Sequence, residues 1–242
     1  MNQIIESTSK LYNSVESNAK ITPRVVEVGV GLGDLSVRLL ERFSLIAYEI
    51  DSELCGYFKD RFPKDRFTLF NKDVLTLQKQ NGWLCNEKYI LVSNLPYYVA
   101  TKIILNALKD NLCVGMVVMT QKEVAMKFCA EVGKKEFCAL SVLTQDLSKH
   151  IHFIANVPPS AFIPAPKVES SIFSIEKNDN IFNTDFERML KMAFSAPRKM
   201  AIKNLDSING IEAIFERLNI PKNARAHQIS TQQYHQIFHN II

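Results

Sequence analysis

Short apolar runs alternate with amphipathic stretches along the first two thirds of the chain. After a polar lead over residues 1–20 with helical character, β-branched and apolar runs recur, separated by stretches in which apolar positions repeat at helical spacing. This alternation indicates strands joined by helices and is typical of a mostly parallel sheet. The pattern predicts strands at 24–30, 45–50, 66–70, 89–93, 114–120 and 150–154.

The pattern changes twice in the remaining third. A proline-rich segment, 157–167, leads into the alternating run 168–175, which predicts one more strand. Because no crossover helix precedes that strand, it should be antiparallel to its neighbour. From residue 178 onward only helical periodicity remains. We therefore expect an α/β fold with a Rossmann-like sheet domain over 1–177 and a small all-helical domain over 178–242.

Composition places the chain among ordinary folded proteins. Hydrophobic residues make up 47% and charged residues 22% of its 242 residues, which argues against a disordered or fibrous chain. The net charge of +4 and the pI of 8.7 are only weakly basic. A domain built mainly to grip phosphates would carry a larger basic excess, so charge alone does not indicate a nucleic-acid partner.

The cysteines indicate a reducing environment and no metal centre. They are odd in number and lack any C-x-x-C pair, so we interpret them as small apolar side chains. The N-terminus has no charged start followed by an apolar core, and no apolar run approaches membrane-spanning length. We expect a cytoplasmic monomer without a metal ion or a membrane partner. The cysteines are Cys55, Cys85, Cys113, Cys129 and Cys138.

A glycine-rich loop joins the first predicted strand to the amphipathic stretch 35–43. Its glycines, Gly29, Gly31 and Gly33, permit positive φ angles and let a ligand approach the backbone. Asp34 suits the N-cap position of the following helix. The spacing is G-x-G-x-G, whereas a dinucleotide fingerprint is G-x-G-x-x-G. The shorter spacing favours S-adenosylmethionine, which has no pyrophosphate.

Two acidic residues follow the next two predicted strands. Glu49 ends the second strand and is placed to accept hydrogen bonds from both ribose hydroxyls of the cofactor, and Asp73 could accept one from its adenine amine. A lone acid at a strand end is usually a solvated or turn-forming group. Because the two acids follow successive strands after the glycine loop, their combination favours the cofactor role. The residues expected to contact the cofactor are Glu27, Gly29, Gly31, Gly33, Glu49, Ile50, Asp73, Val74 and Asn94.

The most specific signal is Asn94-Leu95-Pro96-Tyr97, directly after the fourth predicted strand. With this motif the chain resembles the N6-adenine methyltransferases, and its surroundings are similar to the ribosomal RNA adenine dimethyltransferase (KsgA) family. The resemblance implies S-adenosylmethionine-dependent dimethylation of adenine N6 in 16S ribosomal RNA, in an immature small (30S) subunit during ribosome biogenesis. It runs from about residue 25 to the C-terminus and includes the segments 121–125, 162–170 and 193–199.

The motif also suits the chemistry that the resemblance implies. The adenine amine is a poor nucleophile because its lone pair is delocalised into the ring, so the site must supply acceptors as positive charge develops on nitrogen. The side-chain oxygen of Asn94 and the carbonyl of Leu95 can accept the amine hydrogens, and Pro96 holds Leu95 extended. Tyr97 offers a ring face to an extruded base, and by resemblance Phe162 covers the other face. The plain alternatives are a turn for the motif and a loop anchor for Phe162.

Basic residues in three regions are candidate RNA contacts. The resemblance of the helical domain to the family's RNA-facing domain is the reason to prefer this role over an ordinary solvated surface. The candidates are Lys134, Lys135, Arg198, Lys199, Lys203, Lys222 and Arg225.

Two departures from the family pattern concern the cofactor site. The family's glutamine-containing N-terminal segment is not found, and the start at Met1 resembles the helix that follows it, so we expect a shortened N-terminus. Val30 stands where the family often has proline, which leaves the loop less preorganised.

Two other functions compete with the small-subunit hypothesis. A large-subunit ribosomal RNA adenine methyltransferase of the antibiotic-resistance type would share all of this chemistry. A non-catalytic ribosome-assembly factor would fit the missing N-terminal segment. A DNA adenine methyltransferase fits less well, since no separate DNA-reading domain is visible. We favour the small subunit because of the segments 162–170 and 225–230.

Overall fold

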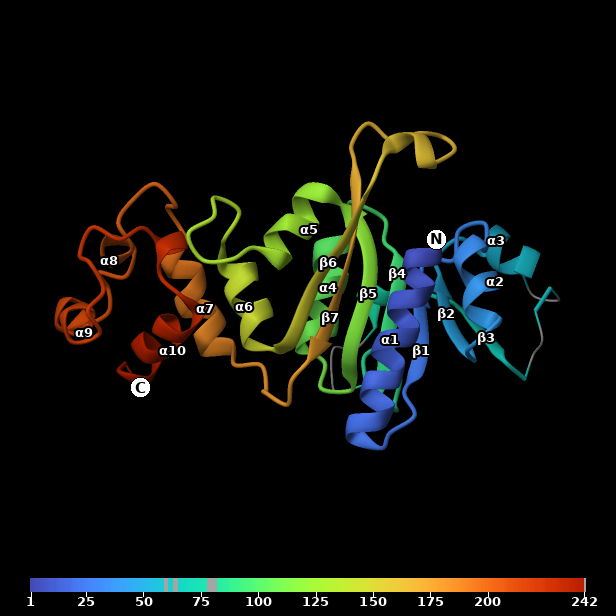
Figure 1. Ribbon diagram of the computed structural model, residues 1–242, viewed down its shortest axis with the longest axis horizontal. Coiled ribbons are helices and arrows are strands. Elements are labelled where there is room, and N and C mark those ends of the chain that lie inside the picture. Colours follow the sequence, from blue (N-terminus) through green and yellow to red (C-terminus); the bar gives the residue numbers. More distant parts are fainter. Residues whose placement is uncertain (59–60, 63–64, 78–81, 242) are drawn as a thin grey trace. The chain divides into compact units, whose positions relative to one another are not determined.

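The computed structural model describes residues 1–58, 61–62, 65–77 and 82–241. A seven-stranded sheet forms the centre of its larger part (Figure 1), in the order β3-β2-β1-β4-β5-β7-β6. Neighbouring strands from β3 to β5 are parallel, whereas β7 is antiparallel to both β5 and β6. The strands are β1 (Arg24–Val28), β2 (Leu45–Glu49), β3 (Phe67–Asn71), β4 (Tyr89–Asn94), β5 (Cys113–Gln121), β6 (Ser148–Val157) and β7 (Ser170–Lys177).

The prediction of a mostly parallel sheet with an antiparallel last strand is confirmed. Each predicted strand coincides with one of the seven, and β7 reverses direction because it follows β6 without a crossover helix. The order of strands adds what the sequence pattern did not contain. β7 does not extend the edge of the sheet but lies between β5 and β6.

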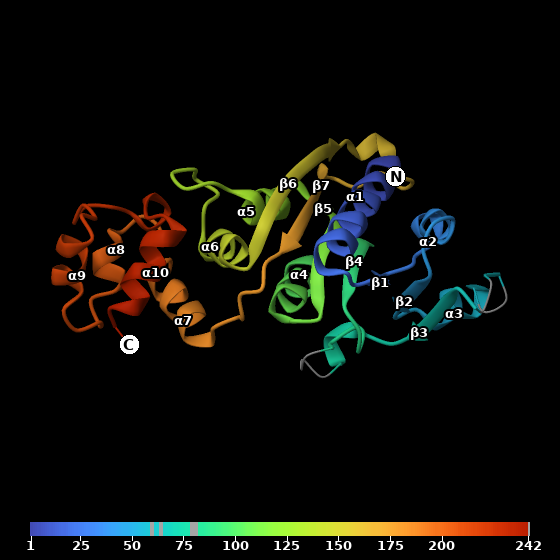
Figure 2. The same ribbon diagram turned by 60° about the horizontal axis from the view of Figure 1, so that its bottom comes forward.

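Helices cover both faces of the sheet. Figure 2 shows α1 and α4 on opposite faces. Parallel strands buried on both sides read as continuous apolar runs, and β4 is buried along its length except at its last residue. The helices of this part are α1 (Asn2–Ala19), α2 (Asp34–Leu40), α3 (Ser52–Phe58) and α4 (Ala100–Lys109), with the 3₁₀ turns η1 (Val74–Thr76) and η2 (Pro159–Ala161).

The apolar faces of α1 and α2 build the core on one side of the sheet. Ile4, Leu11 and Val15 of α1 are buried in the same cluster as Leu35 and Leu39 of α2. The polar lead of the sequence is thus an amphipathic helix, and its apolar stripe supplies part of the core.

The chain divides into two compact units. The larger combines Met1–Ala125 with Ser148–Asp179, and the smaller combines Met126–Leu147 with Asn180–Ile242. The domain boundary at 177/178 stays a prediction. The smaller unit also contains residues 126–147, because Phe137, Val142 and Leu143 belong to the same core cluster as the C-terminal helices.

The smaller unit is helical. Its helices are α5 (Lys122–Cys129), which begins in the larger unit, α6 (Ala139–Asp146), α7 (Thr184–Ala193), α8 (Ala201–Asn204), α9 (Ile211–Arg217) and α10 (Thr231–His239), with the 3₁₀ turn η3 (Ala226–Gln228). Across the described ranges of both units, no helix has the length and apolar character needed to span a bilayer.

Candidate active site

The glycine loop after β1 has the backbone geometry that the sequence predicts. Gly29, Gly31 and Gly33 have φ of 78°, 56° and 88°, a region that residues with a Cβ rarely adopt. The Gly29 N–H donates to the carbonyl of Tyr48 at 2.8 Å, and the Gly33 N–H donates to that of Val30 at 3.0 Å. The loop therefore turns tightly from the end of β1 into α2.

Gly33 also allows an aromatic ring to pack against the loop. A Cβ at this position would lie 2.7 Å from Cε1 of Phe58, which is closer than real contacts allow. Gly33 itself is the N-cap of α2, and no side chain in the described part of the chain caps the helix. The expectation that Asp34 is the N-cap is therefore wrong, because the left-handed glycine makes the turn one residue earlier. Asp34 instead occupies the first helical turn, where its charge complements the helix dipole.

The carboxylate of Glu49 ties the glycine loop to the end of β2. Its Oε2 accepts the N–H of Gly31 at 3.1 Å, and its Oε1 accepts the N–H groups of Ile50 at 2.8 Å and Asp51 at 3.0 Å. The residue is 7% exposed. Charge-assisted hydrogen bonds of this kind are among the strong ones. The loop and the strand end therefore form one hydrogen-bonded unit around a carboxylate.

Glu27 lies beneath the same loop. It is buried in β1, and its Oε2 accepts a hydrogen bond from the hydroxyl of Ser36 at 2.6 Å. Burial raises the pKa of Glu27 to about 8, with the hydrogen bond from Ser36 opposing the rise and the charge of Glu49 adding to it. The Ser36 bond joins β1 to the first turns of α2, so Glu27 supports the loop from the core side. Its contact with a cofactor stays a prediction.

The other predicted cofactor residues follow the carboxyl ends of β2 and β3. Oδ1 of Asp73 accepts the N–H of Leu75 at 2.8 Å and caps the turn η1. Val74 is buried, and its carbonyl accepts the indole N–H of Trp83 at 2.9 Å. Ile50 presents an exposed apolar side chain. Since β2 and β3 are parallel neighbours, these residues lie on the same edge of the sheet as Glu49.

The motif at the end of β4 meets the glycine loop. Asn94 is the last residue of the strand and is exposed, whereas Leu95 is buried and its N–H donates to the carbonyl of Met119 at 2.9 Å. The position of a Cβ on Gly29 lies 3.6 Å from Cδ of Pro96. β1 and β4 are paired neighbours, and this pairing brings the two motifs together. The glycine loop and the Asn94 motif therefore adjoin at the carboxyl edge of the sheet, and their roles in methyl transfer stay predictions.

Tyr97 is held by the last strand of the sheet. Its hydroxyl lies 2.6 Å from Oγ of Ser170, the buried first residue of β7. Antiparallel pairing sets Ser170 opposite Gln121, where β5 ends. The carboxyl edge of β4 and β5 and the start of β7 therefore coincide, and the hydrogen bond fixes the Tyr97 side chain there.

Phe162 lies in the connection from β6 to β7, which projects beyond the strands in Figure 1. Its side chain is half-buried and packs against the core of the larger unit, and the next residue, Ile163, is fully exposed. The segment leads directly to Ser170, so it belongs to the edge that carries Tyr97. The stacking role of Phe162 stays a prediction.

Four residues that the sequence analysis did not single out support this edge. The amide of Asn71 donates to the carbonyls of Glu49 at 3.0 Å and of Ile50 at 3.1 Å. The other three have been described above. They are Ser36, Phe58 and Ser170.

The predicted RNA contacts fall in the smaller unit, where the backbone links several of them. The Gly133 N–H, next to Lys134 and Lys135, donates to the carbonyl of His227 at 2.8 Å. Met200, next to Lys199, forms an isolated antiparallel bridge with Arg225. Three basic segments distant in sequence are therefore neighbours.

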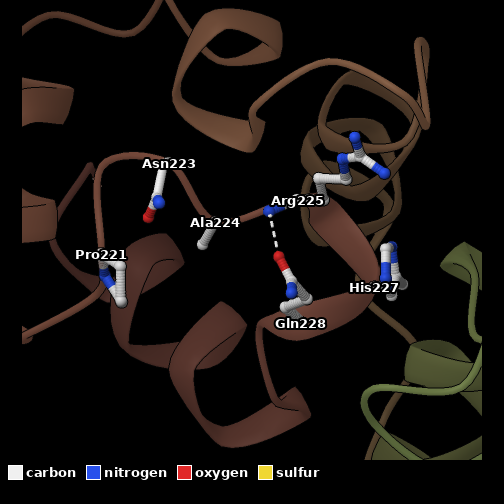
Figure 3. Close-up of a pocket in the computed structure, with 6 residues that line it drawn as sticks. All are labelled: Pro221, Asn223, Ala224, Arg225, His227 and Gln228. Atoms are coloured by element: carbon white, nitrogen blue, oxygen red, sulfur yellow. Dashed lines mark hydrogen bonds between the residues drawn. The ribbon is translucent and has the colours of Figure 1, made fainter.

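A small cavity of about 380 Å³ adjoins this region. Figure 3 shows the guanidinium of Arg225 and the ring of His227 on the same side of it. Lys203 is exposed in α8, Arg198 is exposed before it, and Lys222 lies 4.0 Å from Glu212. A contact at that distance between exposed groups holds the lysine weakly.

No metal site accompanies the candidate active site within the described residues, which contain no group of three or more His, Cys, Asp or Glu side chains placed to hold an ion. The five cysteines are free thiols.

The sheet order, the glycine loop and the motif beside it define the class: a Rossmann-like methyltransferase. Comparison with known proteins gives the family. The sequence model described as "Ribosomal RNA adenine dimethylase" matches residues 2–242. The chain belongs to this ribosomal RNA adenine dimethylase family.

Two relatives show the extent of the similarity. The ribosomal RNA small subunit methyltransferase A of Helicobacter hepaticus is 45% identical over 246 residues, covering 96% of this chain and 87% of that protein. The protein of the same name from Sulfurimonas denitrificans is 42% identical over 241 residues, covering 97% of this chain and 89% of that protein.

Solved structures share the fold. A dimethyladenosine transferase from Plasmodium falciparum aligns with a TM-score of 0.77 at 21% identity, covering 96% of this chain and 94% of that one. The 23S rRNA methyltransferase ErmE aligns with a TM-score of 0.73, also at 21% identity, covering 98% and 97%. A dimethyladenosine transferase and a 23S rRNA methyltransferase thus share this fold, and the substrate must be argued separately.

Proposed function

We propose that the protein uses S-adenosylmethionine to dimethylate the N6 amine of adenine in the 16S RNA of immature small ribosomal subunits, acting as a monomer in the cytoplasm. The observation that carries the proposal is the contact geometry at the carboxyl edge, where Gly29 and Pro96 face each other. The glycine loop suits the methyl donor, and the Asn94 motif suits the acceptor base. Membership of the family and similarity to two proteins named as small-subunit methyltransferases support the substrate.

The residues at the glycine loop fit the proposed cofactor. Apart from its chain neighbours, no described residue has an atom within 4 Å of the place where a Cβ of Gly31 would sit, so the backbone is open to a ligand. Glu49 would hold the ribose, Ile50 and Val74 would flank the adenine, and Asp73 would accept its amine. When bound, S-adenosylmethionine supplies an electrophilic methyl group on a sulfonium.

The protein's own groups prepare the acceptor amine. The Asn94 amide oxygen and the Leu95 carbonyl accept its hydrogens and stabilise positive charge as it develops on nitrogen. The buried Leu95 side chain anchors that carbonyl, and Tyr97, fixed by Ser170, offers its ring face to the extruded base. Phe162 closes over the other face. The Asn94 amide and the Leu95 carbonyl are uncharged acceptors, so the step depends on position more than on a strong base.

The linked basic segments of the smaller unit bind phosphates of the same RNA in this proposal. Lys134 and Lys135, Arg198 and Lys199, and Arg225 supply charge from three neighbouring segments. Phosphate contacts position a nucleic acid without reading its sequence.

Labelled S-adenosylmethionine and undermodified small subunits provide the test. After incubation, nuclease digestion and nucleoside analysis should yield labelled dimethyladenosine from the small-subunit RNA. Asn94→Ala should lower incorporation by about 10²- to 10³-fold, while calorimetry still detects cofactor binding. Asn86→Ala is the matched control, since Asn86 is exposed and lies outside this edge. Undiminished incorporation by Asn94→Ala would reject the proposed mechanism.

The same assay separates the two competing functions. Label appearing only in large-subunit RNA would identify the antibiotic-resistance type. Tight binding to small subunits without incorporation of label would identify a non-catalytic assembly factor.

A further inference from the structure

The larger unit contains a second hollow, at the opposite edge of the sheet. A cavity of about 780 Å³ lies between α1 and the amino ends of β1, β2 and β3. Arg24, Arg42 and Arg66 line it, together with Ser9 and Tyr12 of α1. None of these residues belongs to the glycine loop or the Asn94 motif. The active site proposed above therefore does not explain this basic cavity.

The three arginines lie at the amino ends of three adjacent strands. Arg24 begins β1, and Arg66 directly precedes β3. Arg42 lies just before β2, the strand between β1 and β3. The β ladder holds two of these positions, since the Arg24 N–H donates to the carbonyl of Lys88 and the Arg66 carbonyl accepts the N–H of Leu45, both at 2.8 Å. Sheet pairing thus holds two of the three arginines at one opening, and Arg42 lies before the strand between them.

The basic cavity keeps a positive excess. Its lining within the described residues includes one acid, Glu87, which lies 3.1 Å from Arg24. The guanidinium of Arg42 donates to the hydroxyl of Ser9 at 3.0 Å, and that of Arg66 donates to the carbonyl of Phe43 at 3.1 Å. These two acceptors are neutral. Three arginines and one glutamate leave a net charge of +2.

Arginine in this setting recognises phosphate. Its planar guanidinium carries five donors, so a cation held by one neutral oxygen retains donors for a phosphate. The Arg24 and Glu87 side chains are 48% and 56% exposed. A small metabolite bound tightly would be largely enclosed, whereas an RNA backbone presents its phosphates to an open surface. The exposure therefore favours a backbone phosphate over a free one.

We propose that the basic cavity binds a backbone phosphate of the ribosomal RNA, at a contact separate from the base-binding edge. The inference rests on the proposed function in taking RNA as the substrate. The five residues of β1 span roughly 16 Å between the two edges. A folded RNA that delivers its adenine to the carboxyl edge would also be held at the amino edge, and this second contact would fix its orientation.

Salt dependence of binding tests the contact without any methyl transfer. Affinity for undermodified small subunits is measured by filter binding at several salt concentrations, with no cofactor. Arg42→Gln combined with Arg66→Gln should weaken binding about 5- to 10-fold and reduce the slope of log affinity against log salt by about 1 to 2. Arg38→Gln is the matched control, since Arg38 is exposed on α2 and does not line the cavity.

A variant with increased affinity excludes misfolding as the cause. Glu87→Gln releases Arg24 from its carboxylate and should tighten binding about 2- to 5-fold, whereas Glu41→Gln, which removes an acid outside the lining, should have a smaller effect. Equal effects of cavity and control variants would overturn the proposal. The proposal would also be overturned if the variant with both Arg42→Gln and Arg66→Gln lost binding to inorganic phosphate or adenosine monophosphate, measured by calorimetry, while its affinity for the subunits stayed unchanged.

The two proposals fail in different ways. Asn94→Ala should retain the full salt dependence of subunit binding while losing methyl transfer. If instead Asn94→Ala retains transfer, the mechanism fails and the salt-slope result still decides the phosphate contact.

Discussion

The two edges of one sheet show opposite chemistry. At the carboxyl edge of β1 and β2, the carboxylate of Glu49 is surrounded by main-chain N–H groups. At the amino edge of the same strands, three arginine side chains surround an open cavity, where Arg42 and Arg66 donate to neutral oxygens and Arg24 pairs with Glu87. Main-chain donors are fixed by the fold, whereas long side chains adapt. The first edge is therefore suited to one small ligand in one position, and the second to a flexible polyanion.

We call the carboxyl edge around Glu49 the fixed edge, and the amino edge with its arginines the adaptable edge. The largest effect should come from a change at the fixed edge. Glu49→Ala removes the proposed ribose acceptor and the anchor of the glycine loop, so we expect the Kd for S-adenosylmethionine to rise about 100-fold, which corresponds to about 2.7 kcal/mol. Calorimetry measures it. Arg42→Gln, at the adaptable edge, should leave this Kd within about twofold. Equal losses in the two variants would break the comparison between the edges.

Gly33→Ala tests how rigid the fixed edge is. The new Cβ combines a positive φ with a clash against Phe58, and we expect the free energy of unfolding to fall by about 2 to 3 kcal/mol. Gly31→Ala has the same sign of φ but open space around its Cβ, so it should cost only about 1 kcal/mol. Denaturant unfolding gives both values, and a cost for Gly33→Ala no greater than that for Gly31→Ala would show that the ring can move aside.

Glu27→Gln should change how stability depends on pH. Because the pKa of Glu27 is raised to about 8 in the folded state, against 4.5 for the free group, the folded protein binds more protons between these values. This contribution is fully present below about pH 4.5 and is lost as pH rises to about 8. The amide does not ionise, so the variant should have a higher free energy of unfolding than wild type at pH 8.5.

At pH 5 the advantage of Glu27→Gln should nearly vanish. If the difference in the free energy of unfolding between Glu27→Gln and wild type were the same at pH 5 and pH 8.5, the raised pKa of the buried Glu27 would be contradicted. The free energy of unfolding of Arg42→Gln should show no such pH trend relative to wild type, because the described residues that line that cavity include no buried acid.

The smallest effect should be at Tyr97. Ser170→Ala removes the partner of its hydroxyl, and we expect kcat to fall about 5- to 10-fold, or about 1 kcal/mol, with the cofactor Kd unchanged. Tyr97→Phe should have a similar effect, and the double variant should be no worse than either single one. Additive losses in the double variant would show that the two hydroxyls act independently.

Much of the fixed edge could be predicted from the sequence because its determinants are local. Periodicity predicts all seven strands, and the glycines, Glu49 and the Asn94 motif each occupy a strand end. The partners of these residues could not be predicted in the same way. Ser170 is 73 residues from Tyr97 in sequence, and only the antiparallel pairing of β7 brings it close. No short pattern contains that contact.

The misplaced N-cap and the unassigned packing have physical causes as well. Asp34 is a good capping residue by type, but Gly33 already makes the left-handed turn. Residues 126–147 share a core cluster with residues some fifty positions further on, as with Val142 and Leu190, and no short pattern contains that packing. The basic cavity is harder still to detect from sequence, since Arg24, Arg42 and Arg66 are separated by ordinary spacings.

The reversal of β7 also affects how this enzyme class can diversify. β6 runs in the direction of β5, so the connection 158–169 both departs from and returns to the edge that carries Asn94. An insertion or deletion there would change the segment beside Tyr97 and Asn94 and leave every strand pairing intact. The segment beside Tyr97 and the pairing of the strands therefore depend on separate stretches of chain, and one can evolve without the other.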